Sequence, residues 1–329
     1  MNNSEIKVSI ICCTYNHEKY IEEAIKSFLM QKTNFKFEVL IHDDASTDKT
    51  AEIVRKYEKD YPDIIKPIYQ TENQYSKGKI IVSEFLIPRA EGKYVALCEG
   101  DDYWNHPDKL QKQYDALEAH SEIDMCAHNS IVIHAITGEL VNRHWITKNG
   151  VRVASIEETI LGEGGFVATN SLFFRKSVYE NELPFRKIMA YDYTLQIAGA
   201  LKGGILCLPD FMSAYRFAVP NSFTDRKRKE NKQEVSFYLK KRAVLEQLDK
   251  DTGNKYHDVI TGRLMLNEIL VTNKAVENIR ILVKYKNGFH VLSTKDKIKI
   301  LVKCFCPILL RLKHKLFISK RNKIIKELR

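Results

Sequence analysis

The chain has 329 residues, of which 44% are hydrophobic and 29% charged, and this composition excludes a largely disordered protein. The net charge is +10, and residues 295–329 account for it with twelve basic and two acidic side chains. The remaining 294 residues therefore carry no net charge. The sequence accordingly predicts no nucleic-acid partner for the body of the protein.

Seven cysteines are scattered without zinc-site spacing, and the ten histidines show no metal-ligand spacing either. We interpret the histidines as structural or surface residues. The first residues lack the apolar segment of a secretory signal, and no uncharged apolar run is long enough to span a bilayer. These features predict a cytoplasmic protein.

Apolar runs of strand length alternate with amphipathic segments through the first 120 residues. This alternation predicts an α/β fold, a Rossmann-like and mostly parallel sheet with flanking helices. The predicted strands cover residues 7–13, 37–41, 64–69 and 94–98, and the predicted helices cover 17–31, 47–57, 80–90 and 107–119.

The pattern changes after residue 120. A hairpin, a strand, a helix and two short strands around Pro209 are predicted, and from about residue 226 the spacing is helical. We expect a catalytic domain over residues 1–222 and a helical C-terminal region over 223–329, with a basic amphipathic tail over 295–329. The predicted elements before residue 222 are 125–133 with 140–145, 172–175, 191–201, 205–208 and 211–215.

Polar clusters follow three of the predicted strands, where ligands bind in parallel α/β sheets. They are Thr14-Tyr15-Asn16, Asp43-Asp44 and Asp101-Asp102. Adjacent carboxylates repel one another, and a hard divalent cation with oxygen ligands would neutralise them. Each aspartate pair could equally be a solvated or helix-capping turn. Asp192 begins a predicted helix, where an acidic residue is usually only an electrostatic complement to the helix dipole.

Four segments together resemble the motifs of family 2 glycosyltransferases of the bacterial surface-polysaccharide type, which have the GT-A fold. Residues 8–16 (VSIICCTYN) resemble the opening motif, and residues 43–48 (DDASTD) resemble the second motif. Residues 90–104 (AEGKYVALCEGDDYW) resemble the metal-site segment. Residues 191–195 (YDYTL), followed by Gly203-Gly204 and Tyr215-Arg216, resemble the stretch that holds the catalytic base.

The resemblance implies an inverting, metal-dependent transfer of a sugar from a nucleoside-diphosphate-sugar, with a UDP-sugar as the expected donor. The expected acceptor is a hydroxyl of a lipid-linked glycan or surface polysaccharide. Asp192 would be the catalytic base, and Mg²⁺ or Mn²⁺ would be held among Asp102, Asp101 and Glu99. Position 99 is Glu where the family usually has Asp, so the choice among these three stays open. The residues implied in nucleotide-sugar binding are Thr14, Tyr15, Asn16, Asp43, Asp44 and Asp101.

Two other functions are compatible with a sheet of this kind. A nucleotidyltransferase would carry a Gly-rich, basic loop after the first strand, and Thr14-Tyr15-Asn16-His17 is not such a loop. A non-catalytic sugar-nucleotide-binding protein would not need the acidic residues.

The basic tail mixes lysines and arginines with bulky apolar residues over 298–318. This pattern suits an interfacial helix on an anionic membrane surface, at the inner face of the cell membrane. A solvated helix packed on the rest of the protein is one alternative. Nucleic-acid binding is another, but no aromatic interleaving or RNA motif accompanies the charge, so no nucleic-acid partner is predicted.

Overall fold

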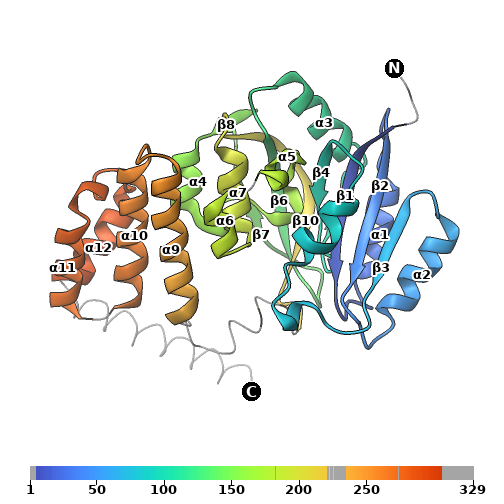
Figure 1. Cartoon of the computed structure of the whole chain (residues 1–329), viewed down its shortest axis with the longest axis horizontal. Helices are drawn as coiled ribbons and strands as arrows, with labels where there is room; N and C mark the ends of the chain where they lie inside the picture. The colour runs from blue at the N-terminus through green and yellow to red at the C-terminus, as the bar shows by residue number, and fades with distance from the viewer. Residues whose placement is uncertain are drawn as a thin grey trace. The chain divides into compact units, whose positions relative to one another are not determined.

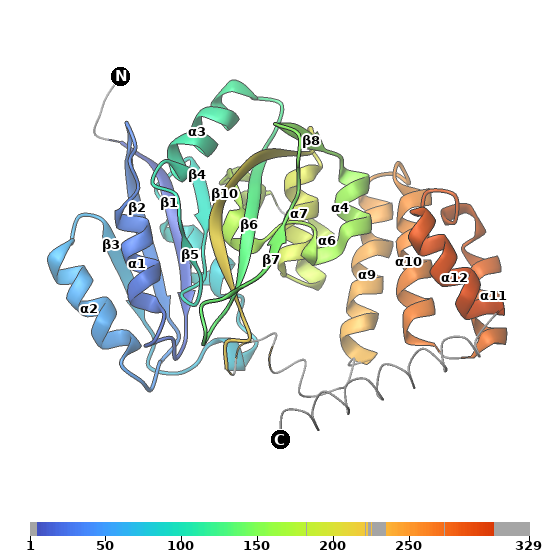
Figure 2. The ribbon, with the colours of Figure 1, turned by 180° about the vertical axis from the view of Figure 1, so that it is seen from behind.

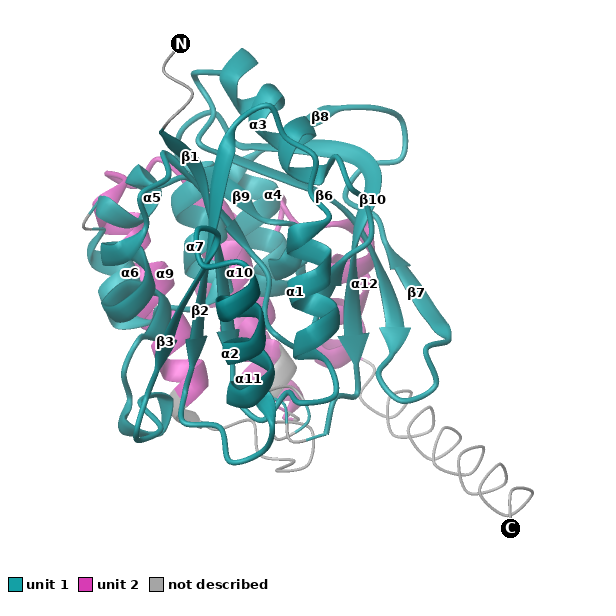
Figure 3. Cartoon of the chain, turned by 90° about the vertical axis from the view of Figure 1, so that its right-hand side faces the viewer, with its two compact units in different colours: residues 1–233 teal, residues 234–329 magenta. Residues whose placement is uncertain are grey.

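The computed structural model describes residues 5–181, 183–220, 222, 225, 235–272 and 274–305. The chain divides into two compact units, residues 1–233 and 234–329 (Figure 3). Between the expected boundary at residue 222 and the end of the first unit, only residue 225 is described.

The first half of the sheet is parallel, and the predicted α/β, GT-A-like class is confirmed (Figure 1). Its strands lie in the order β3-β2-β1-β4. They are nearly continuous apolar runs, as strands covered on both faces require. Their bounds are β1 (Ile6–Thr14), β2 (Lys36–Asp43), β3 (Ile65–Tyr69) and β4 (Tyr94–Leu97).

Amphipathic helices connect these strands: α1 (Ile21–Leu29), α2 (Thr50–Asp60) and, after β4, α3 (Lys109–Ala119). In α1, Ile21, Ala24, Ile25 and Phe28 are buried, and their spacing places them on one helix face. Figure 2 shows α1 in front of strands β1 and β2.

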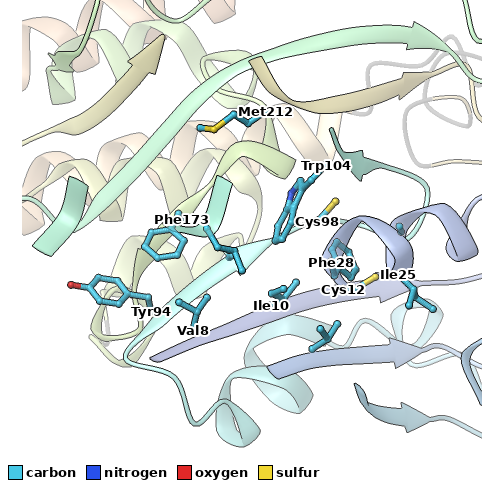
Figure 4. Packing of buried hydrophobic residues seen from close by; sticks show 14 of the residues in the cluster. Val8, Ile10, Cys12, Ile25, Phe28, Tyr94, Cys98, Trp104, Phe173 and Met212 are labelled. Atoms are coloured by element: carbon cyan, nitrogen blue, oxygen red, sulfur yellow. The ribbon is translucent and has the colours of Figure 1, made fainter. Parts of the chain in front are cut away.

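The core of the first unit lies between α1 and the sheet. The ring of Phe28 packs edge-on against Trp104 with a centroid separation of 4.9 Å (Figure 4). Burial of a side chain of this size contributes roughly 1.5–3 kcal/mol. This packing fixes Trp104, and with it the chain that follows Asp101-Asp102.

The helix predicted over residues 80–90 is instead a π-helical turn, η2 (Val82–Leu86), followed by a 3₁₀ turn, η3 (Ile87–Arg89). Pro88 explains the difference, because proline has no N–H with which to continue an α-helical ladder.

The second half of the sheet is mixed. Strand β9 (Phe173–Arg175) is antiparallel to β4 and to β6 (Met125–His134), and β10 (Ile205–Phe217) is parallel to β6. The predicted hairpin is confirmed as β6 with β7 (Leu140–His144). The two short strands predicted around Pro209 are one strand, β10, whose register shifts between Leu208 and Phe211. Such irregularities accommodate proline within a sheet.

Short elements complete the first unit. Two strands pair antiparallel with β10, namely β5 (Tyr103–Trp104) and β8 (Arg152–Ala154). The remaining helices and turns are η1 (Tyr75–Lys77), α4 (Ile156–Gly162), η4 (Glu163–Gly165), η5 (Thr169–Ser171), α5 (Ser177–Glu180), α6 (Pro184–Ile188) and α7 (Asp192–Ala200).

The second unit is helical where it is described, as expected. Apolar side chains of α9 and α10, among them Leu245, Leu248 and Ile260, form its interior. No helix in the described parts of the chain has both the length and the apolarity to cross a membrane. Its elements are α9 (Val235–Asp251), α10 (His257–Val271), α11 (Ala275–Lys284), η6 (Lys286–Gly288) and α12 (Thr294–Phe305).

Candidate active site

The candidate site lies at the carboxyl edge of β1 and β4. The chain runs from β1 outward to β2 and β3 and then returns to place β4 on the other side of β1, so strand order reverses there. Ligands of open α/β sheets bind at such a point. The Gly100 N–H donates to the Cys13 carbonyl at 2.9 Å, and the Asp44 N–H donates to the Thr14 carbonyl at 3.0 Å. The structure therefore brings all three predicted polar clusters to one edge.

Asn16 joins the loop after β1 to the loop after β2. Its backbone is left-handed, with φ of 55°, a conformation that asparagine tolerates. Its side-chain oxygen accepts the Thr47 N–H at 2.8 Å, and its own N–H donates to Ser46 Oγ at 2.9 Å. Asn16 thus holds the two loops together, while the neighbouring Tyr15 is 39% exposed.

Asp43 and Asp44 are both buried but have different environments. Asp43 accepts the Ser46 hydroxyl and the Ser46 N–H, the latter at 3.3 Å. Burial raises the pKa of Asp43, and these hydrogen bonds oppose the rise. Asp44 accepts the backbone N–H groups of Gln74 at 2.7 Å and Tyr75 at 3.0 Å. Both Asp44 oxygens are therefore engaged in fixing the loop before η1.

Asp102 is 1% exposed and also has two occupied oxygens. Oδ1 accepts the Arg216 N–H at 2.8 Å, and Oδ2 accepts Asn170 Nδ2–H at 2.9 Å. These bonds connect the loop after β4 to β10 and to η5.

The Arg216 side chain strengthens the same connection. Its guanidinium donates to the Asp101 carbonyl at 2.7 Å and pairs with Glu23 of α1. It also lies over the rings of Tyr20 and Tyr103, with 5.1 and 4.6 Å to their centroids. Arg216 is therefore a cationic anchor for the loop that carries the acidic residues.

Negative charge is concentrated in this loop. Desolvation raises the pKa of Glu99, and repulsion by Asp101, Asp192 and Asp102 adds to the rise. Desolvation also raises the pKa of Asp102, with a further contribution from Asp101, against the opposing effect of Arg216. Burial and mutual repulsion therefore oppose ionisation of these carboxylates, and a cation bound beside them would favour it.

The described residues contain no group of three or more His, Cys, Asp or Glu side chains arranged to hold a metal ion. Because both Asp102 oxygens already accept hydrogen bonds, Asp101 and Glu99 supply the more available carboxylates of the three. Two carboxylates suit Mg²⁺ or Mn²⁺, since Mg²⁺ usually takes one or two together with phosphate oxygens and water. The donor chemistry thus fits a divalent cation shared with a phosphate ligand.

Asp192 is the first residue of α7, and its Oδ2 accepts the Thr169 hydroxyl at 2.6 Å. Desolvation raises its pKa, while the Thr169 bond and its own N–H oppose the rise. Because Asn170, the residue after Thr169, binds Asp102, the turn η5 links the predicted base to the acidic loop.

Several site residues were not predicted from the sequence. Thr169 and Asn170 follow a glycine-rich segment, and nothing in their spacing marked them. Arg216 belonged to a family-like motif, but its contact with Asp102 depends on tertiary structure. His17 was interpreted only as structural or surface. Its Nδ1 is 3.2 Å from Thr14 Oγ1, and its Nε2 is 3.9 Å from Asp101 Oδ2.

Comparison with known proteins is consistent with this geometry. Residues 9–183 match the model of a family described as glycosyl transferase family 2. An uncharacterized protein of Mycobacterium tuberculosis is 35% identical over 230 residues, which cover 67% of this chain. The chain spans 63% of the length of that relative. A glycosyltransferase of Nostoc, also uncharacterized, is 28% identical over 224 residues, covering 66% of each chain.

Solved structures share the fold. The poly(ribitol-phosphate) β-N-acetylglucosaminyltransferase TarS of Staphylococcus aureus, crystallised with UDP-GlcNAc, has a TM-score of 0.62 at 19% identity. The alignment covers 91% of this chain and 82% of that one. A Pyrobaculum calidifontis mannosyltransferase in complex with GDP-Man and Mn²⁺ has a TM-score of 0.50 at 17% identity, covering 92% and 88%.

Divalent cations should stabilise the protein through the acidic loop. At a Mn²⁺ concentration of a hundred times its dissociation constant, we expect about 2.7 kcal/mol of stabilisation, measured as a rise in melting temperature. Asp101→Asn combined with Glu99→Gln should remove most of that rise. Without metal, the double variant should melt no lower than the unsubstituted protein, because repulsion is relieved.

The control for this experiment is Glu52→Gln, which removes an acidic side chain from the first turn of α2. It should retain the full Mn²⁺-dependent rise. An equal rise in the double variant would show that the cation binds elsewhere.

Gly100 should tolerate no side chain. A Cβ there would lie 2.7 Å from Thr14 Oγ1 and 2.9 Å from Thr14 Cβ. Gly100→Ala should therefore cost about 1–3 kcal/mol in unfolding free energy, as overpacking usually does. Gly165→Ala is the matched control, since its Cβ would meet nothing within 4 Å. Equal denaturant midpoints for the two variants would contradict the contact.

Proposed function

Because the chain belongs to glycosyltransferase family 2, we propose that it is an inverting enzyme that transfers a sugar from a nucleoside-diphosphate-sugar to a hydroxyl group. The observation that carries the proposal is the pair of hydrogen bonds by which the adjacent residues Thr169 and Asn170 join Asp192 to Asp102 of the acidic loop. The acidic loop would hold the leaving diphosphate, and Asp192 would accept the proton of the attacking hydroxyl.

The donor we propose is a UDP-sugar. The UDP-GlcNAc complex of the structurally similar staphylococcal enzyme supports this choice. Thr14, Tyr15 and Asp43 would hold the base and ribose, because they lie where the nucleotide of an α/β fold binds. Asn16 and Asp44 would act by holding the loops in place, since their side-chain oxygens already accept hydrogen bonds from the chain.

A divalent cation, Mg²⁺ or Mn²⁺, would be held by Asp101 and Glu99 beside the diphosphate. When bound, it would stabilise the negative charge that develops on the leaving group. Asp102 would keep the loop in place through its bonds to Arg216 and Asn170.

Asp192 would be the general base. With Oδ2 held by Thr169, Oδ1 would take the proton from the acceptor hydroxyl as its oxygen attacks the anomeric carbon. The bond from that carbon to the diphosphate breaks in the same displacement, which inverts the anomeric centre. The family assignment argues against a nucleotidyltransferase, and an assay of sugar transfer tests whether the chain is instead a non-catalytic sugar-nucleotide-binding protein.

A lipid-linked glycan or surface polysaccharide is the proposed acceptor. We also propose that the protein is cytoplasmic and associates with an anionic membrane surface, which the described end of the second unit supports. Residues 274–305 carry eight basic and two acidic side chains. Helix α12 packs through Ile300 and Cys304, so residues 295–305 belong to the fold of the second unit. The rest of the predicted tail, 306–329, lies outside the described residues. Exposed apolar side chains on α11 and α12 include Val276, Val283, Ile298, Leu301 and Phe305.

Replacing the base should separate binding from transfer. Asp192→Asn should leave donor affinity nearly unchanged in calorimetry, because asparagine keeps an oxygen for the Thr169 hydroxyl. Transfer should fall at least about a hundredfold, the usual scale for loss of a general base. The substrate is chosen from a release assay across UDP-, GDP- and dTDP-sugars. Lost donor binding with normal transfer per bound donor would make Asp192 a binding residue.

Membrane association should depend on the exposed lysines of α12. We expect the full chain to sediment with phosphatidylglycerol vesicles and to be released by high salt, since each basic residue contributes about 1 kcal/mol. Lys295→Glu with Lys299→Glu should weaken sedimentation by at least about tenfold. Lys56→Glu with Lys59→Glu on α2 makes the same change in net charge and should leave sedimentation unchanged. Equal effects of the two pairs would place the contact elsewhere.

A further inference from the structure

The turn η5 lies between the two acidic parts of the site. Thr169 donates its hydroxyl to Asp192 Oδ2 at 2.6 Å, and the next residue, Asn170, donates its side-chain N–H to Asp102 Oδ2 at 2.9 Å. Two consecutive side chains therefore bind the proposed base and the loop of the proposed metal site.

Asn170 is itself firmly held. It is 1% exposed, its Oδ1 accepts the Ser213 hydroxyl at 2.7 Å, and its carbonyl accepts Trp104 Nε1–H at 2.9 Å. Trp104 packs against Phe28 in the core of the first unit. A side chain supported in this way can hold a catalytic group within the narrow range of geometry that catalysis needs.

We propose that Thr169 is a positioning residue for Asp192, which rests on the proposed role of Asp192 as the base. The Thr169 hydroxyl fixes one carboxylate oxygen and thereby directs the other to the acceptor hydroxyl. Because Asn170 binds Asp102, η5 also sets the separation between the base and the acidic loop that would hold the diphosphate.

The same bond sets the protonation of the base. A hydrogen bond to the ionised carboxylate favours that form and opposes the desolvation that raises the pKa of Asp192. The titratable groups whose charges interact with Asp192 are Glu99, Tyr179 and Cys13. All three are neutral or negative, so among the described residues the Thr169 hydroxyl and the Asp192 N–H are the contacts that favour ionised Asp192.

The test compares Thr169→Val with Thr169→Ser in the full chain, on the donor that the release assay identifies. Valine keeps the shape of threonine but has no hydroxyl, whereas serine keeps the hydroxyl. Thr169→Val should lower kcat by about tenfold or more, leave the KM for donor nearly unchanged, and move the acidic limb of the kcat profile to higher pH. Thr169→Ser should restore both kcat and the position of that limb.

Equal losses of kcat in the valine and serine variants, or an acidic limb that stays in place in Thr169→Val, would overturn the proposed role of Thr169. No transfer by the unsubstituted protein with any donor would instead overturn the proposed function. Melting temperatures of the two variants within about 2 °C of each other would show that folding does not explain the difference in kcat.

Discussion

The buried carboxylate of Asp102 is the interaction on which the arrangement of the site depends. It accepts hydrogen bonds from Arg216 on β10 and from Asn170 in η5, although these residues are far apart in the sequence. A buried ionised carboxylate is costly unless such bonds satisfy it. The loop after β4, the antiparallel half of the sheet and the turn that carries Thr169 must therefore meet in one arrangement. The pairing of β5 with β10 and the bonds of Asn170 to Ser213 and Trp104 support the same arrangement.

The other acidic side chains of this loop have a different environment. Burial raises the pKa values of both Asp102 and Glu99, but hydrogen bonds from Arg216 and Asn170 oppose the rise at Asp102, whereas further carboxylates add to the rise at Glu99. Proteins retain such unfavourable charge mostly where a ligand completes it. A divalent cation would complete this site, because it would bring positive charge to Asp101 and Glu99 and keep positions open for the diphosphate oxygens of a donor.

The sequence predicted correctly those elements whose residue pattern lies within one short segment. The apolar run of β1 and the helical spacing of α1 are properties of short segments, and both elements formed as predicted. A helical segment formed within the predicted 80–90, but as π-helical and 3₁₀ turns, the latter containing Pro88. The two strands predicted around Pro209 formed a single strand with a register shift. Local spacing also brought Asp43 and Asp101 to one edge correctly. It could not show that Asn170 binds Asp102, since that contact joins residues separated by 68 positions in the sequence.

The site also extends beyond the region that matches the family model. The family match covers residues 9–183 and thus includes the strand ends and η5, but it ends before Asp192 and Arg216. Both residues lie outside the matched region and bind residues inside it. Asp192 accepts the Thr169 hydroxyl, and the Arg216 N–H donates to Asp102. The part of the chain beyond the match therefore supplies one carboxylate for Thr169 and one backbone donor for Asp102. The order of the strands brings the three polar clusters to one edge, and these two hydrogen bonds attach the later part of the chain to that edge.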